Sequence, residues 1–221
     1  MLKSFTLPPI IMPVLPTNFL INFRSSKRWI TALFMVAVIG VSVLVGWILT
    51  KVMKGKHYKS CAPINMTLLG VVSLTLLLRY GFSMTTVQGI ILMFVLLYAS
   101  CSDLTDHTMD EFLWVMVVIL GLLSVETVGF PSMLIGAVAV FLPQIFSAVL
   151  AKNPIGGADI KLTTALAFLL GWQRGLIMLI TGMLLAVVVM LIARKYEKNK
   201  KGQPFALIPF VSAAAMAAFF V

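Results

Sequence analysis

Two aspartates, Asp103 and Asp159, are the residues of this sequence best placed to do chemistry. Asp103 closes an apolar run that ends in Leu-Tyr-Ala-Ser-Cys-Ser. Asp159 lies in the stretch Pro-Ile-Gly-Gly-Ala-Asp-Ile-Lys-Leu, residues 154–162, where another apolar run begins. A carboxylate near hydrocarbon is energetically unfavourable, so an acid at the boundary of an apolar segment is by default a functional candidate.

Two carboxyl groups brought together from separate segments could share one proton, because like charges at short range push one of them toward the neutral form. The ionised group can then activate a water molecule while the protonated group polarises a peptide carbonyl. This is the chemistry of aspartic proteases, and it needs neither a metal ion nor a nucleophilic side chain. It requires a fold that places Asp103 beside Asp159.

The residues before Asp159 indicate a tight turn. Gly156 and Gly157 free the backbone, and Pro154 ends any helix that runs into them. An alternative interpretation is that Asp159 only caps the helix that follows, which is a favoured role for aspartate. The local sequence leaves both interpretations open.

The segment after Asp103 holds further polar residues. We interpret Asp106, His107, Asp110 and Glu111 as a solvated loop in which Asp110 is the N-cap of the next helix. The only other histidine, His57, is isolated from these, so we predict no metal site and no cofactor. The chain has no HExxH or GxSxG motif, and its two cysteines form no CxxC pair.

The composition is that of an integral membrane protein. Hydrophobic residues make up 61% of the chain and charged residues 11%, with a mean hydropathy of +1.07, whereas soluble domains carry roughly 25% charged residues. Because lipid forces backbone polar groups to pair internally, we expect an all-α bundle of membrane helices. The net charge of +10 comes mostly from short basic clusters between apolar runs, which indicates contact with anionic lipid and not with nucleic acid.

Apolar runs predict about eight membrane segments in this polytopic bundle. Seven approach the roughly 20 residues of a spanning helix; they lie near 30–50, 62–79, 84–102, 111–128, 131–151, 174–193 and 204–221. The eighth, 160–173, is too short to cross a core of roughly 30 Å, and such short or broken helices mark functional sites. Residues 1–29 are expected to form an irregular or interfacial segment before a membrane domain at 30–221.

Basic residues set the expected orientation. The lysine- and arginine-rich loops 51–60 and 194–203 should be cytoplasmic under the positive-inside rule. With eight segments, the loops 103–110 and 152–159 fall on the same side. Both aspartates should therefore face the cytoplasm from the cell inner (plasma) membrane, although the basic residues near 24–28 conflict with this topology.

The two aspartate motifs resemble those of the type IV prepilin peptidases. Asp-Leu-Thr at 103–105 follows an apolar segment, and Gly-Gly-Ala-Asp-Ile-Lys-Leu at 156–162 is similar to the glycine–x–hydrophobic–aspartate signature of intramembrane aspartyl proteases. Residues 203–210 also resemble the start of that family's last membrane segment. The resemblance covers roughly 90–221, and the second motif is its more specific part.

The resemblance implies a reaction and a set of site residues. Asp103 and Asp159 would be the catalytic pair, and substrate binding would fall to Gly156, Gly157 and Lys161. The family removes the short basic leader from pilin-like precursors at the cytoplasmic membrane face. The implied partners are therefore the lipid membrane and a prepilin or pseudopilin precursor.

Two features depart from the family pattern. Many members have an Ile-Pro-Asn turn after the first aspartate, whereas this chain has Thr-Met-Asp at 108–110. Many bacterial members also carry a cytoplasmic insert with paired cysteines, associated with N-methylation of the product. The corresponding loop here, about 51–61, has no cysteine pair, so we expect a peptidase without N-methyltransferase activity.

Two other interpretations remain open. A polytopic membrane transporter could use the same acids for proton coupling, but it would carry internal repeats and acids near mid-membrane, and the sequence indicates neither. An inactive relative of the peptidases would keep the motifs without cleaving a precursor.

Overall fold

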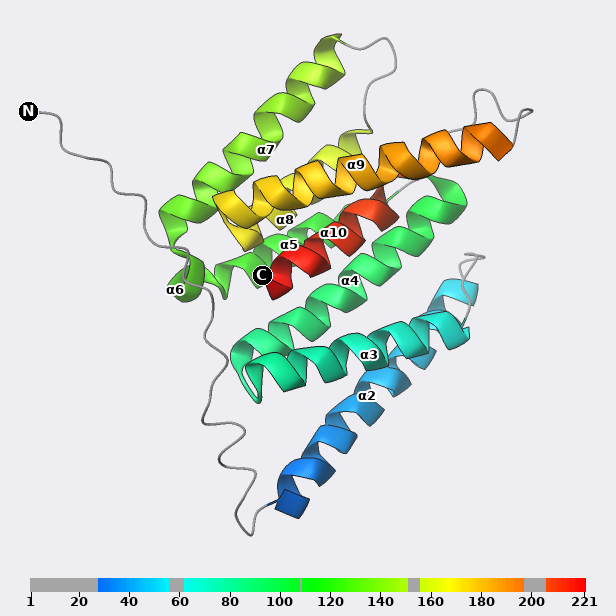
Figure 1. The fold of residues 1–221 in the computed structure, drawn as a ribbon, viewed down its shortest axis with the longest axis vertical. Helices are drawn as coiled ribbons and strands as arrows, with labels where there is room; N and C mark the ends of the chain where they lie inside the picture. The colour runs from blue at the N-terminus through cyan, green and yellow to red at the C-terminus, as the bar shows by residue number, and fades with distance from the viewer. Residues whose placement is uncertain (1–27, 56–61, 108, 151–155, 197–205) are drawn as a thin grey trace, which may run out of the picture.

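The computed structural model describes residues 28–55, 62–107, 109–150, 156–196 and 206–221. These residues form helices joined by turns, with no strand among them (Figure 1). The helices are α2 (Arg28–Gly55), α3 (Ala62–Tyr80), α4 (Met84–Asp106), α5 (Phe112–Leu122), α6 (Val125–Val128), α7 (Phe130–Leu150), α8 (Gly157–Leu170), α9 (Trp172–Tyr196) and α10 (Ile208–Phe220). The all-α prediction is confirmed. Most of the N-terminal segment predicted as irregular, 1–29, lies outside the described residues.

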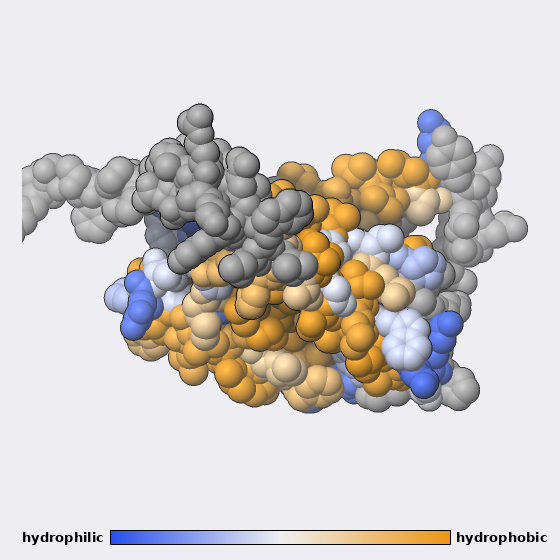
Figure 2. Space-filling view, turned by 90° about the horizontal axis from the view of Figure 1, so that it is seen from below, coloured by the Kyte–Doolittle hydropathy of each residue, from blue (hydrophilic) through white to orange (hydrophobic). Residues whose placement is uncertain are grey.

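Five of the described helices are long and apolar enough to cross a membrane: α2, α3, α4, α7 and α9. The 23 residues of α4 extend about 35 Å at 1.5 Å per residue, more than the roughly 30 Å of a hydrocarbon core. Large apolar side chains cover the outer faces, and Figure 2 shows a broad hydrophobic surface with hydrophilic residues toward its two sides. This is the surface of a multi-pass membrane protein.

The short helix α8 lies inside the bundle. It packs against α5, α7, α9 and α10, while α4 packs against α3, α5 and α10 (Figure 1). Its side chains Leu162, Leu166 and Leu169 are almost completely buried. With 14 residues, α8 is the short segment that the sequence predicted.

Glycines of the neighbouring helices α5, α7 and α9 pack closely against the C-terminal half of α8. A Cβ on Gly136 of α7 would lie 2.7 Å from the carbonyl carbon of Gly171 and 2.8 Å from the carbonyl oxygen of Ala167. A Cβ on Gly121 of α5 or on Gly175 of α9 would lie 2.9 Å from a side-chain atom of α8. Small residues allow membrane helices to approach in this way. This end of α8 is therefore fixed by backbone contact.

The prediction of one helix at 111–128 is wrong, because α5 and α6 are separated by a turn at Leu123 and Ser124. Gln88 of α4 donates from Nε2 to the carbonyl oxygen of Leu120 and to the hydroxyl of Ser124, both at 3.2 Å. Gln88 and Ser124 are buried. The side chain of Gln88 thus gives the carbonyl of Leu120 a second donor, beside the backbone N–H of Leu123 at the end of α5.

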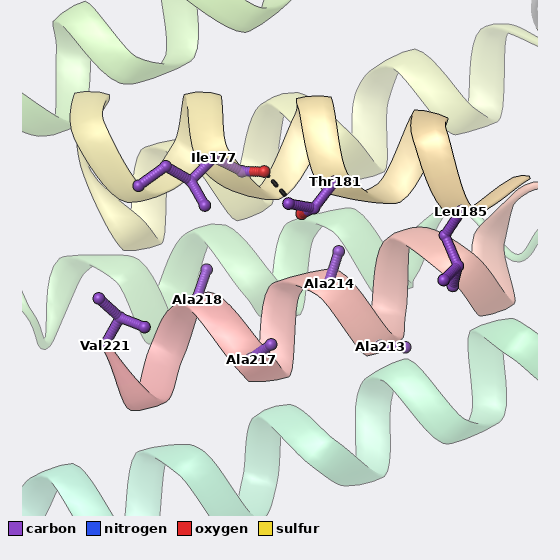
Figure 3. Close-up of a pocket in the computed structure, with 8 residues that line it drawn as sticks. All are labelled: Ile177, Thr181, Leu185, Ala213, Ala214, Ala217, Ala218 and Val221. Carbon is purple, nitrogen blue, oxygen red and sulfur yellow. Dashed lines mark hydrogen bonds between the residues drawn. The ribbon is translucent and has the colours of Figure 1, made fainter.

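An apolar groove of about 300 Å³ lies between α9 and α10 (Figure 3). It is lined by Ile177, Thr181, Leu185, Ala213, Ala214, Ala217, Ala218 and Val221. The hydroxyl of Thr181 donates to the carbonyl of Ile177 in its own helix at 2.6 Å. Because no titratable side chain lines this groove, it cannot supply acid–base chemistry.

Candidate active site

Asp103 lies in the last turn of α4 and is 6% exposed. The backbone N–H of Ile208, the first residue of α10, donates to Asp103 Oδ2 at 3.0 Å. His107 ends α4 in the left-handed conformation, with φ of 51°, and its N–H donates to the carbonyl of Asp103 at 3.2 Å. The carboxylate of Asp103 therefore faces the positive end of the α10 dipole.

Asp159 lies in the first turn of α8 and is half-buried. The N-cap of α8 is Gly156, which has no side chain to form a capping hydrogen bond. The interpretation that Asp159 is the capping residue is therefore wrong, although its charge is favourable near a helix N-terminus. A Cβ on Gly156 would lie 3.2 Å from Asp159 Oδ2, so the glycine leaves room for the carboxylate.

The structure brings Asp103 and Asp159 together. The two carboxyl groups lie close enough for the charge of Asp103 to act on that of Asp159. The start of α10 lies at the same point, because its first N–H group binds Asp103. Two carboxyl groups, carried by helices that are distant in the sequence, thus form an acidic pair at one end of the bundle.

Gly156 and Gly157 lie at the exposed edge of this pair. A Cβ on Gly157 would meet no atom within 4 Å, so the backbone there borders open space. Because neither glycine carries a side chain, the backbone at the start of α8 is open to the approach of an extended peptide.

Lys161, on the second turn of α8, is bonded to Glu111 at the start of α5. Its ammonium group lies 2.8 Å from both carboxylate oxygens of Glu111. The Nε1–H of Trp114 donates to Glu111 Oε2 at 2.9 Å. The hydrogen bond from Lys161, followed by that from Trp114, holds the pKa of Glu111 below its ordinary value.

The sequence did not indicate this ion pair. Glu111 is exposed, as predicted for a solvated loop, but its partner lies 50 residues away. The prediction that Asp110 is the N-cap of α5 is wrong, because the N-cap is Glu111, which makes no capping hydrogen bond. Asp110 instead accepts a hydrogen bond from the hydroxyl of Tyr98 at 2.6 Å.

The described residues contain no group of three or more His, Cys, Asp or Glu side chains that could hold a metal ion. His57 and Cys61 lie outside this part of the chain. The chemistry that the described site can supply is that of two carboxyl groups, a buried one on α4 and a half-buried one on α8.

Fold and site together define a polytopic helical membrane protein with an acidic pair at one end of its bundle. Residues 90–191, which are 102 of the 221 residues, match the model of the type IV leader peptidase family. This match supports a protease of the leader peptidase type that acts on a protein substrate. The matched residues include Asp103 and Asp159. No curated protein and no solved structure matches the chain.

Proposed function

We propose that this protein is an intramembrane aspartyl endopeptidase that removes the short basic leader from type IV prepilin-like precursors. The observation that carries the proposal is that Asp103 and Asp159 both lie within the residues that match the leader peptidase family, close enough for the charge of Asp103 to act on Asp159. A transporter would place coupling acids near the middle of the membrane, whereas this pair lies where α4 ends and α8 begins.

The proposed reaction uses one ionised and one protonated carboxyl group. The ionised group takes a proton from water, and the oxygen of that water attacks the carbonyl carbon of the scissile peptide bond. The protonated group gives its proton to the carbonyl oxygen, which forms a tetrahedral diol. The carbon–nitrogen bond then breaks as the carboxyl group that took the proton from water gives it to the leaving nitrogen. The other, now ionised, takes a proton from a hydroxyl of the diol, so that a carboxylic acid forms.

The proposed location is the cytoplasmic face of the inner membrane. Lys51 and Lys54 in the last turns of α2 and Lys195 near the end of α9 agree with the positive-inside rule on the side where the aspartates lie. At that face, a precursor could present the bond that joins its basic leader to its membrane helix.

We propose that Gly156, Gly157 and Lys161 form the part of the site that the precursor meets. Both glycines are exposed, and the side chain of Lys161 is 49% exposed. Glycine allows the backbone of another chain to approach closely. We also propose that no cofactor is needed and that the protein has no N-methyltransferase activity, because only residues 56–61 separate α2 from α3.

Cleavage of a pilin-like precursor in membranes tests this function. We expect Asp103→Asn and Asp159→Asn each to lower the cleavage rate by at least about 10²-fold, the lower range for general acid–base catalysis. Asp106→Asn is the matched control, because Asp106 is an exposed acid of the same helix end and should leave cleavage unchanged. Cleavage that survives either of the first two substitutions, in protein that inserts normally, would refute the assignment.

A further inference from the structure

Side-chain bonds tie the start of α8 to its neighbours. The N-cap, Gly156, provides no such bond. Thr163 lies 2.7 Å from Gln144 of α7 through its hydroxyl, and Lys161 binds Glu111 of α5. Lys161 is only two residues from Asp159, so its bond acts on the turn that carries the carboxyl group.

Glu111 is held in place from both sides. Its two oxygens accept hydrogen bonds from Lys161 at 2.8 Å, and one of them also accepts from Trp114 at 2.9 Å. Trp114 lies on the same helix, one turn further, and fixes the direction of the carboxylate. Glu111 is thus an oriented acceptor for Lys161.

The same connection continues to the helix of the other aspartate. Asp110 precedes Glu111 and accepts a hydrogen bond from Tyr98 at 2.6 Å. Tyr98 is a buried residue of α4, five positions before Asp103. Side-chain bonds therefore lead from α4, through residues 110 and 111, to Lys161 on α8.

We propose that Glu111 and Lys161 are positioning residues that set the distance between the carboxyl groups of Asp103 and Asp159. The proposal rests on the proposed function and assigns Lys161 a role exerted through Glu111. Because Lys161 and Glu111 are exposed (49% and 70% of their side chains), their bond adds little to the stability of the whole bundle. Its loss should move Asp159 without unfolding the protein.

Charge reversal separates this role from direct substrate contact. Displacement of a reacting group by about 1 Å can lower a rate about 10²-fold, so we expect Glu111→Lys and Lys161→Glu each to lower kcat about 10- to 100-fold. KM should stay unchanged in Glu111→Lys and rise only in Lys161→Glu, because the precursor also meets Lys161. The double variant that exchanges the two charges should recover kcat to within about 3-fold of the unmodified protein. Asp106→Lys, which makes the same charge change on a nearby exposed acid, is the control and should retain cleavage.

A second readout does not depend on cleavage. Spin labels on Leu104→Cys and Ala158→Cys, in a background with Cys61→Ala and Cys101→Ala, report the distance between the end of α4 and the start of α8. The distance distribution should broaden or shift in each reversed variant and return in the exchanged pair. This result supports the positioning role even if no precursor is cleaved, in which case only the proposed function fails. An unchanged distribution in the single variants, or a kcat that the exchange does not recover in active protein, would overturn the proposal.

Discussion

The two ends of α8 are held in different ways. Around its C-terminal end, glycines of α5, α7 and α9 pack so closely that a Cβ added to any of the three would lie within 3 Å of a neighbouring atom. At its N-terminal end, the side-chain contacts to neighbouring helices include the exposed ion pair of Lys161 and the hydroxyl bond of Thr163. Backbone packing of this kind tolerates almost no displacement, whereas an exposed ion pair can rearrange. The end of α8 that carries Asp159, the proposed catalytic residue, is thus the adjustable end.

The two aspartates also differ in how firmly the surrounding structure holds them. Asp103 is buried and accepts a hydrogen bond from the backbone of α10. Asp159 is half-buried and lies beside two exposed glycines. One carboxyl group is therefore part of the packing of the bundle, and the other lies where a substrate could reach it.

The largest effect on stability should follow a change at the C-terminal end of α8. Gly136→Ala would place a Cβ within 2.8 Å of backbone atoms, so we expect the free energy of unfolding to fall by about 1–3 kcal/mol, as for other overpacked sites. Gly40→Ala in α2 is the matched control, because a Cβ there meets no atom within 4 Å. Denaturation in detergent would measure both. Equal stability of the two variants would contradict the close packing of α8.

A smaller effect should distinguish the aspartates. Asp103→Ala removes the acceptor of the first N–H of α10, so the free energy of unfolding should fall by about 0.5–2 kcal/mol, the range for lost helix caps. Asp159→Ala removes no such hydrogen bond to another described residue and should change stability by less than about 0.5 kcal/mol. The same denaturation experiment measures the difference. A larger loss of unfolding free energy in Asp159→Ala than in Asp103→Ala would contradict the conclusion that Asp103 is the aspartate built into the packing.

The ion pair predicts a specific pH dependence. The pKa of Glu111 is lowered from 4.5, so the fold favours the ionised carboxylate. The stabilisation that the ion pair with Lys161 provides is therefore lost as the pH falls through this lowered pKa. Above pH 4.5, the ratio of kcat between the unmodified protein and Glu111→Gln should therefore be constant. The ratio should approach one only below that pH. A ratio that changes between pH 6 and 8 would show that Glu111 does not act as a permanently charged partner.

The smallest effect is expected at the link between α4 and residue 110. Tyr98→Phe removes the hydroxyl that donates to Asp110 and leaves the ring in place. A hydrogen bond to a charged group contributes about 1.5–3 kcal/mol where it is buried, but Asp110 is partly exposed. We expect kcat to fall about 3-fold with unchanged KM. An effect as large as that of Glu111→Lys would mean that Tyr98 has a separate role.

Much of the fold follows from the sequence. Long apolar runs predict membrane helices because lipid leaves the backbone few alternatives, and the shortness of α8 is visible in the spacing of its charged and glycine neighbours. The break between α5 and α6 is not visible, because residues 112–123 are continuously apolar. That break is accompanied by the bond from Gln88, on another helix, to Leu120 and Ser124.

The candidate site could be predicted only in part. Asp103 and Asp159 stand out because each acid lies at the boundary of an apolar run, and their catalytic role stays a prediction. The bond from Ile208 to Asp103 joins residues 105 positions apart, and the ion pair joins residues 50 apart. Neither leaves a local signal, because a backbone N–H is present at almost every residue and exposed charges have many possible partners.

The most direct test of the central claim is a double-mutant cycle on kcat/KM for precursor cleavage. It compares Asp103→Asn, Asp159→Asn and the double variant. Residues that act as one catalytic unit give strongly non-additive losses, so we predict that the double variant loses no more activity than the more damaging single substitution. If the two losses multiply, or if either single variant cleaves at the unmodified rate, Asp103 and Asp159 do not form a catalytic pair.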